Sequence, residues 1–283
     1  GLVPELPEVE TIVRSLRTPQ NLTDAQKQEA GVVGRTILHA SVLWPRSIAA
    51  PSEGDFTSLI AGQQITAIGR RGKFLHFTLS RQHLLIHLRM SGDILLESAE
   101  STRDTKHDRV VFHLDDGNRM AFNDTRKFGR VWLVDDPCEV TCSLGPEPLD
   151  ETLTAEEFYA RLHKNKRTIK PLLLDQTFIA GLGNIYTDEC LFAAGIHPQS
   201  RASALDQQQA AVLLASIRQV LLEGIKRNGA SIDWVYRGGD FQNHFQVYQR
   251  DGKTCYRCGA IIQRTTLGQR GTHFCPHCQS LTA

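Results

Sequence analysis

The sequence predicts a multidomain α+β protein, in which a β-sandwich with a leading helix is followed by a helical domain and a small metal-binding module. Short apolar runs crowd the region from Thr36 to Val134, helix signals follow from about residue 151, and two Cys-x2-Cys pairs lie near the end. With 283 residues the chain is long enough for two domains and a small third one. Its 41% hydrophobic and 22% charged residues are typical of globular proteins.

The first expected element is a helix over Pro7–Leu16. Proline is favoured at the first helical position. Glu5, Glu8 and Glu10 place negative charge in and before the first turn, where the helix dipole stabilises it. The polar stretch from Thr18 to Gly31 then predicts a surface loop.

A β-rich region follows this loop. Its short apolar or alternating runs are separated by Gly and Asp clusters, a pattern typical of a sandwich or a barrel, of which we expect the sandwich. The expected strands are Ile65–Ile68, Phe74–Leu79, Leu84–Leu88, Val110–Leu114, Arg119–Phe122 and Val131–Val134. Asp115-Asp116-Gly117-Asn118 predicts a hairpin turn between two of them.

Domain boundaries are predicted from changes in composition. The composition changes near Asp135-Asp136-Pro137, and the prolines of Leu144–Leu149 indicate a linker. The expected division is a sandwich domain over 1–135, a linker over 136–150, a helical domain over 151–240 and a metal module over 241–283.

Capping signals predict the helices of the second domain. Thr154-x-x-Glu157 is a capping box ahead of an apolar helix face. Ser203-x-x-Asp206 is a second one, which opens a long amphipathic helix that Asn228-Gly229 ends.

The four cysteines near the end predict a zinc ribbon. Cys255-x2-Cys258 and Cys275-x2-Cys278 are 16 residues apart, and four thiolates complete a closed tetrahedral shell around one structural Zn²⁺. Gly259 suits the tight turn of such a knuckle. Cys138, Cys142 and Cys190 are left over as structural or incidental residues, and we expect a zinc protein of a reducing compartment, not a disulfide scaffold.

Charge is unevenly distributed along the chain. The last 43 residues hold five Lys/Arg against one Asp/Glu, which favours contact with a phosphate backbone, although a solvated basic tail fits the charge alone equally well. The longest apolar runs are too short to span a bilayer, and no secretory leader opens the chain. We therefore expect a cytoplasmic protein that does not contact membranes.

Motifs at both ends and in the middle of the chain resemble the formamidopyrimidine-DNA glycosylase family. The segments that carry the resemblance are Pro4–Glu10, Arg70–Leu75, His87–Gly92, Lys106–Asp108, Asn123–Gly129, Ala180–Glu189 and the four-cysteine ribbon. The resemblance implies a helix–two-turns–helix domain, duplex DNA with oxidised or abasic sites as the partner, and a bacterial-type monomer that works on the nucleoid. It also implies excision of oxidised purines (8-oxoguanine and formamidopyrimidines) followed by strand cleavage through β,δ-elimination.

The resemblance also implies catalytic residues. Pro4 would attack the sugar carbon C1′ through a free secondary amine, with Glu5 moving the protons and Glu8 supporting the site. Lys73 would assist β-elimination, and Arg270, on the tip of the zinc hairpin, would donate the proton for δ-elimination.

DNA-binding residues are implied in the same way. Excision requires that the damaged nucleotide leaves the base stack, which costs free energy. Apolar side chains that wedge into the stack, together with an arginine, can offset that cost. By resemblance Met90 fills the gap, Arg126 pairs with the orphaned base and Phe128 wedges the stack. Phosphate or lesion contacts are implied for His107, Lys166, Lys170, Asn184 and Arg270. The glycines before Asn184 would let a helix N-terminus approach a phosphate.

Two departures keep alternatives open. Pro4 follows Gly1-Leu2-Val3, and an acylated proline nitrogen has no nucleophilic lone pair, so a lesion-binding protein without catalysis is one alternative. Ser231–Phe241 is shorter than the family's usual lesion-capping loop, which leaves open the sister branch that acts on oxidised pyrimidines. A zinc-ribbon module on an unrelated scaffold does not explain residues 70–189.

Overall fold

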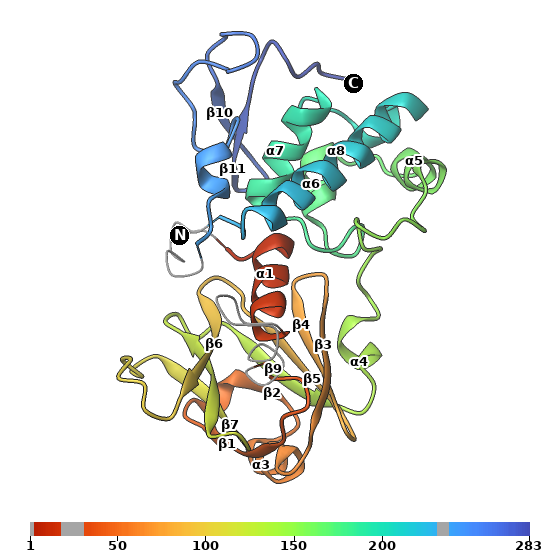
Figure 1. The fold of residues 1–283 in the computed structure, drawn as a ribbon. Coiled ribbons are helices and arrows are strands. Elements are labelled where there is room, and N and C mark those ends of the chain that lie inside the picture. Colours follow the sequence, from red (N-terminus) through yellow and green to blue (C-terminus); the bar gives the residue numbers. More distant parts are fainter. Residues whose placement is uncertain (1–2, 18–30, 231–237) are drawn as a thin grey trace. The chain divides into compact units, whose positions relative to one another are not determined.

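The computed structural model describes residues 3–17, 31–230 and 238–283, and these residues form two compact units. The first unit contains the described residues up to Ser143 except Glu5–Pro7, which belong with Leu144–Ala283 to the second (Figure 1). The expected loop over Thr18–Gly31 lies almost wholly outside the described residues. Most of the expected lesion loop, Ser231–Arg237, also lies outside them.

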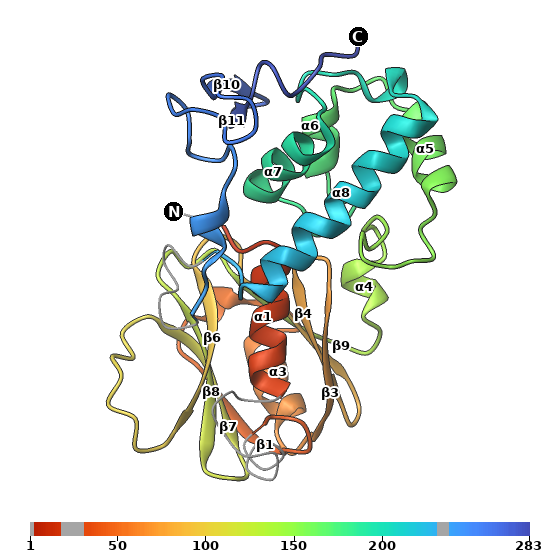
Figure 2. The same cartoon turned by 45° about the horizontal axis from the view of Figure 1, so that its top comes forward.

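The first unit is the expected sandwich of two sheets, which form two layers (Figure 2). One sheet has the order β1-β7-β8-β6 and the other β2-β9-β5-β4-β3, with β2 and β9 parallel and the other pairs antiparallel. The strands are β1 (Ile37–Val42), β2 (Ile48–Ala50), β3 (Ile65–Arg71), β4 (Phe74–Leu79), β5 (His83–His87), β6 (Gly92–Ser98), β7 (Asp108–Leu114), β8 (Asn118–Asp124) and β9 (Arg130–Val134). Alternate residues are buried along β4, as the period of a strand requires.

Helix α1 (Leu6–Arg17) is attached to strand β3 of the first unit. The Glu10 carboxylate accepts from Arg70 Nε at 3.3 Å, and Arg17 Nη2 donates to the Ile68 carbonyl at 2.6 Å. Helix α3 (Glu53–Ile60) interrupts the region that we expected to be β-rich throughout. Its signal in the sequence was Ser52, whose hydroxyl caps the helix by accepting from the backbone of Asp55.

Helix α4 (Cys138–Thr141) precedes the boundary between the units. Cys138 and Cys142 at its two ends are both exposed and are joined by a disulfide, whereas Cys190 is free and buried. Cys138 and Cys142, expected as structural or incidental residues, therefore have a local structural role as a pair. Their spacing places two side chains on one side of a helical turn, which is the signal that the sequence contained.

The described residues of the second unit form α-helices and the ribbon hairpin (Figure 1). Its elements are α5 (Ala155–His163), α6 (Ile169–Leu174), α7 (Asn184–Ala194), α8 (Gln207–Lys226), β10 (Gln263–Leu267) and β11 (Arg270–Phe274), with short 3-10 turns at Ala202–Ala204 and Phe241–His244. Thr154 caps α5 as expected. The cap of α8 is Asp206 and not Ser203, because Gln209 completes a reciprocal capping box with Asp206.

Within the described ranges, no helix has the length and apolar character needed to cross a bilayer.

Candidate functional site

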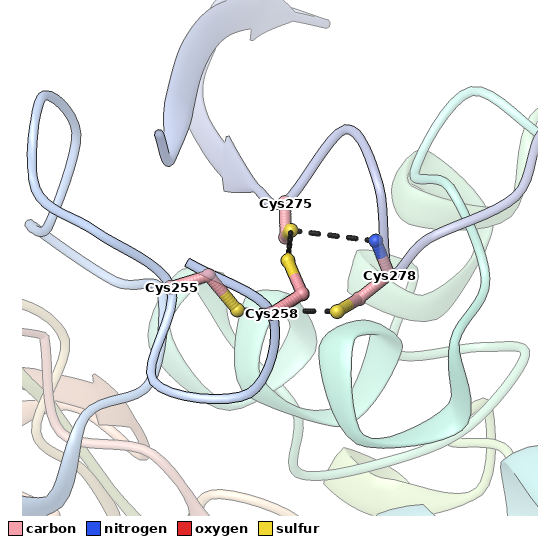
Figure 3. Close-up of side chains that lie close together, drawn as sticks. All are labelled: Cys255, Cys258, Cys275 and Cys278. Carbon is pink, nitrogen blue, oxygen red and sulfur yellow. Dashed lines mark hydrogen bonds between the residues drawn. The ribbon is translucent and has the colours of Figure 1, made fainter. Parts of the chain in front are cut away.

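The four cysteine sulfurs of the ribbon lie within 4.8 Å of one another (Figure 3). Cys255 and Cys278 sulfurs are 3.9 Å apart, and those of Cys258 and Cys275 are 3.5 Å apart. Tetrahedral zinc with Zn–S bonds near 2.3 Å requires S···S distances of about 3.8 Å, so this donor set fits one zinc ion. Backbone N–H groups face three of the sulfurs, and Gly259 has the positive φ of 81° that its knuckle turn requires. The four ligands close the shell, so the metal's role is structural.

The hairpin tip of the ribbon presents Arg270. Strands β10 and β11 are joined by Gly268 and Gln269, both with positive φ, which makes a tight two-residue turn. Arg270 is the first residue of β11, pairs with Leu267 and is exposed. A guanidinium on such a tip can reach an anion without rearrangement of the hairpin.

The N-terminus of α7 binds the Glu5 carboxylate. Backbone N–H groups of Gly183, Ile185 and Tyr186 donate to its oxygens at 2.5, 3.0 and 3.3 Å, and the Glu5 side chain is buried. A Cβ at Gly183 would lie only 2.6 Å from the Glu5 carboxyl carbon, so the glycine makes room for this carboxylate. The anion that this helix end holds in the structure is the Glu5 carboxylate, and the phosphate contact expected beside it stays a prediction.

Asn184 lies one residue beyond Gly183 and contacts the zinc hairpin. Its Nδ2 donates to the Gly271 carbonyl at 3.0 Å, next to Arg270. Burial raises the pKa of Tyr248, while a hydrogen bond with Asn184 opposes the rise, so the Tyr248 hydroxyl is a further neighbour. The structure thus places Asn184 against the carbonyl of Gly271, the residue after Arg270, and adds Tyr248, which sequence reasoning missed.

Lys170 is enclosed by the second unit and does not reach its surface. Its ammonium, 0% exposed, donates to Asp188 Oδ1 at 2.7 Å and to the Gly271 carbonyl at 3.0 Å. Burial lowers the pKa of Lys170, and the charge of Asp188 opposes this change. The Lys170 side chain is therefore not exposed for the phosphate or lesion contact that was predicted for it. Lys166, four residues earlier, is exposed.

Two carboxylates on α7 anchor other segments. Asp188 Oδ2 accepts from the backbone N–H of His273 at 3.0 Å. Glu189 accepts from three consecutive backbone N–H groups, those of Gln246, Val247 and Tyr248, at 2.6 to 2.9 Å. Burial raises the pKa of Glu189 to about 6, against these hydrogen bonds. Sequence reasoning missed both residues, and their signal was two adjacent acids in an otherwise apolar helix.

In the first unit Lys73 lies in the turn between β3 and β4, after Gly72 with φ 56°. It is half-buried and close enough to His87 to affect its charge. Burial, followed by the charges of Arg89 and Lys73, lowers the pKa of His87 to about 3, so the imidazole is neutral at pH 7. The Lys73 ammonium therefore lies near His87, which is three residues before Met90.

Met90, Arg126 and Phe128 lie on two neighbouring loops of the first unit. Met90 and Phe128 are 40% and 55% exposed, and Arg126 Nη1 is 3.7 Å from the Met90 sulfur. Buried Asp124 holds the loops together, because its carboxylate accepts from the Ser91 hydroxyl at 2.5 Å and from the Gly129 N–H at 2.7 Å. An exposed methionine and phenylalanine beside an arginine form a protruding surface.

The remaining candidates lie close to these groups or to α1. The half-buried His107 accepts at its ring Nδ1 from Arg109 Nη2 at 3.4 Å, and its carbonyl accepts from the backbone N–H of Asp124. Pro4 and Glu8 are buried on either side of the α1 start.

The fold and these groups define a zinc-ribbon DNA glycosylase of base-excision repair. The family models that match are the formamidopyrimidine-DNA glycosylase N-terminal domain over residues 3–131, the H2TH domain of the same family over 144–235, and the zinc finger found in FPG and IleRS over 252–281. The chain belongs to the formamidopyrimidine-DNA glycosylase family.

Known relatives match along the whole chain. Formamidopyrimidine-DNA glycosylases of Chloroflexus aggregans and Pelotomaculum thermopropionicum are 44% and 41% identical, over 99% of this chain and 99% and 100% of theirs. Solved structures of the Lactococcus lactis enzyme, with DNA that contains a FAPY-dG lesion or an abasic site, are 36% identical. Both have a TM-score of 0.86 and cover 98% of this chain, with 100% and 99% of theirs.

Proposed function

We propose that this chain is a bifunctional DNA glycosylase and abasic-site lyase, which excises oxidised purines from duplex DNA and then nicks the strand by β,δ-elimination. The observation that carries the proposal is the carboxylate of Glu5, adjacent to Pro4 and held by three N–H groups at the start of α7. A fixed carboxylate beside an amine is the arrangement that proton transfer at that amine requires.

The chemistry follows from a free Pro4 nitrogen. Its lone pair attacks C1′ of the damaged nucleotide, and the base leaves with the C1′–N bond pair. Glu5 takes the proton from the new ammonium and delivers it to the ring oxygen, so that the sugar opens and an iminium forms. The iminium acidifies the C2′ proton, and its removal expels the 3′ phosphate. Lys73 assists this β-elimination, and Arg270 donates the proton for the δ step.

Binding is assigned to residues of both units. Met90, Arg126 and Phe128 enter the space left by the extruded nucleotide, since the exposure of Met90 and Phe128 and the contact between Arg126 and the Met90 sulfur suit a wedge. Asn184 and Arg270 hold phosphates, with further contacts from His107 and Lys166. Glu8 supports the Pro4 segment, one structural Zn²⁺ holds the ribbon, and the protein acts as a monomer in the cytoplasm.

Borohydride trapping tests the proposal. A form that begins at Pro4 should become covalently linked to abasic-site DNA, and a form that retains Gly1-Leu2-Val3 should bind the DNA without linkage, because its proline nitrogen is an amide. Lys73→Ala in the shorter form should keep the adduct and slow strand cleavage. If the extended form is trapped efficiently and Pro4→Ala does not prevent it, the nucleophile is elsewhere and the proposal fails.

The lesion class needs a separate experiment. A solved complex of the Lactococcus lactis relative contains an oxidised pyrimidine, whereas another contains FAPY-dG. We expect kcat/KM to be higher for 8-oxoguanine and formamidopyrimidine duplexes than for an oxidised-pyrimidine duplex. The reverse order would assign the chain to the sister specificity.

A further inference from the structure

A buried ion pair in the second unit lies directly behind the zinc-hairpin tip. Lys170 on α6 and Asp188 on α7 are both 0% exposed, and their charged atoms are 2.7 Å apart. The Lys170 ammonium has a second acceptor, the Gly271 carbonyl at 3.0 Å, which belongs to the residue after Arg270. The pair is therefore connected to the backbone that presents Arg270.

Other hydrogen bonds fix the same short segment to α7. Asn184 donates to the same Gly271 carbonyl at 3.0 Å, and Asp188 accepts both the backbone N–H and the ring Nδ1 of His273 at 3.0 and 3.1 Å. Strand β11 is thus held at two positions two residues apart, Gly271 by Lys170 and Asn184 and His273 by Asp188.

Stability alone does not account for a charged pair at this place. Apolar residues of similar volume often stabilise a core as well as a buried ion pair does. An apolar side chain cannot donate to the Gly271 carbonyl, however, and a hydrogen bond is directional. What the lysine adds is the register of β11 on α7, and with it the position of the backbone that carries Arg270.

We infer that Lys170 is a positioning residue, which works with Asp188 to fix the hairpin so that Arg270 and Asn184 grip the same stretch of backbone phosphates. This inference rests on the proposed phosphate contact of Arg270. Lys170 itself touches no DNA.

A double-mutant cycle tests the inference. Lys170→Met, Arg270→Ala and the double variant are titrated with a duplex that carries a tetrahydrofuran abasic analogue, at several salt concentrations. Each single variant should lower the slope of log affinity against log salt by about 0.9, one phosphate contact. The double variant should lose no more than Arg270→Ala alone, and Lys170→Met in the form beginning at Pro4 should lower kcat up to about 10²-fold through misplacement. Additive losses would mean that Lys170 binds DNA by itself and would overturn the inference, as would an unchanged Lys170→Met.

Two controls keep the outcomes distinct. Arg167→Met breaks an exposed pair with Asp175, away from the hairpin, and its effect should add to that of Arg270→Ala. Lys170→Met with Asp188→Leu leaves no unpaired charge, so it folds and retains zinc while it still loses the contact to Gly271. It should show the same loss of slope as Lys170→Met, and a wild-type slope would refute the positioning role. If Arg270→Ala alone leaves the slope unchanged, it is the proposed phosphate contact that fails.

Discussion

Asp124 in the first unit and Asp188 in the second are both buried, and each holds a segment for which we propose a DNA contact, but in a different way. Asp124 in the first unit accepts from uncharged donors, the Ser91 hydroxyl and the Gly129 N–H, and leaves Met90 and Phe128 exposed on their loops. Asp188 in the second unit accepts from the buried Lys170 ammonium and from His273. The buried anchor of the first unit's loops has uncharged donors, whereas the hairpin is held by a charged pair behind its tip. If the proposed roles hold, exposed side chains on anchored loops suit entry into the duplex, and a hairpin fixed behind its tip suits a phosphate contact.

Metal removal should produce the largest difference between the two units. Chelation or Cys275→Ser should release one zinc per chain and abolish DNA binding, because structural zinc supplies about 10–16 kcal/mol of apparent folding free energy in small fingers. The β-rich unit should remain folded, because its anchors do not involve the metal. Zinc content, duplex binding and the β signal in circular dichroism measure these outcomes. Full binding by Cys275→Ser would remove the ribbon from the DNA interface.

The next largest effect should distinguish the two aspartates directly. Asp188→Asn leaves the Lys170 charge buried without its counter-ion and should cost about 3–5 kcal/mol. Asp124→Asn replaces one acceptor oxygen by an amide group that cannot accept, so one neutral donor loses its partner. The free energy of unfolding should fall by about 1–3 kcal/mol. Urea unfolding of both variants provides the measurement, with Arg167→Met, at an exposed pair, expected near 0–1 kcal/mol. Equal costs for the two aspartates would contradict the distinction drawn between them.

Glu189 gives the second unit a pH dependence of its own. Its folded pKa of about 6 lies above the ordinary 4.5, so between these values the native state binds more protons than the unfolded chain. Stability from this group is therefore present below pH 4.5 and is lost as pH rises through 6, by about 2 kcal/mol at ~1.36 kcal/mol per pKa unit. Unfolding free energies of the wild type minus those of Glu189→Gln, from pH 4.5 to 7, isolate the effect. A difference that is flat with pH would rule it out.

The smallest effect concerns the exposed loop residues. Arg126→Ala and Phe128→Ala should each reduce the preference for damaged over undamaged duplex about ten-fold, roughly 1.4 kcal/mol, because both act only on an extruded site. Lys127→Ala is the matched control on the same loop. Its ammonium lies 4.0 Å from the centre of the Trp44 ring, and its loss should affect both duplexes alike. Equal losses on both DNAs for Arg126→Ala and Phe128→Ala would refute the wedge.

Local patterns predicted much of the fold but little of its anchoring. Phe74–Leu79 is a strand with the expected bounds, because alternation is a property of neighbouring residues. Glu5 and Gly183, by contrast, are 178 residues apart, and no periodicity relates them. Asp188 and Glu189 read as polar positions of a helix, which usually face solvent, and only the packing of other segments around α7 buries them.

The placement of the predicted site residues shows the same division. The cysteine spacing predicted the ribbon because both knuckles are local turns, and the tip arginine followed from it. Lys170 matched a motif, yet its direction depends on the second acceptor offered by Gly271, which is 101 residues away. A motif thus indicates that a residue has a role, but it does not show which residues that side chain contacts.

Helix α7 has consequences for how this chain can vary in length. Its eleven residues are contacted from several directions, at the start by Glu5, along one side by Lys170 and His273, and along another by the backbone of residues 246–248. Each inserted or deleted residue would turn everything beyond it by about 100° and separate the anchors from their partners at once. Insertions and deletions that the protein tolerates should therefore fall outside Asn184–Ala194, because this helix sets the spacing between the anchored segments of the unit.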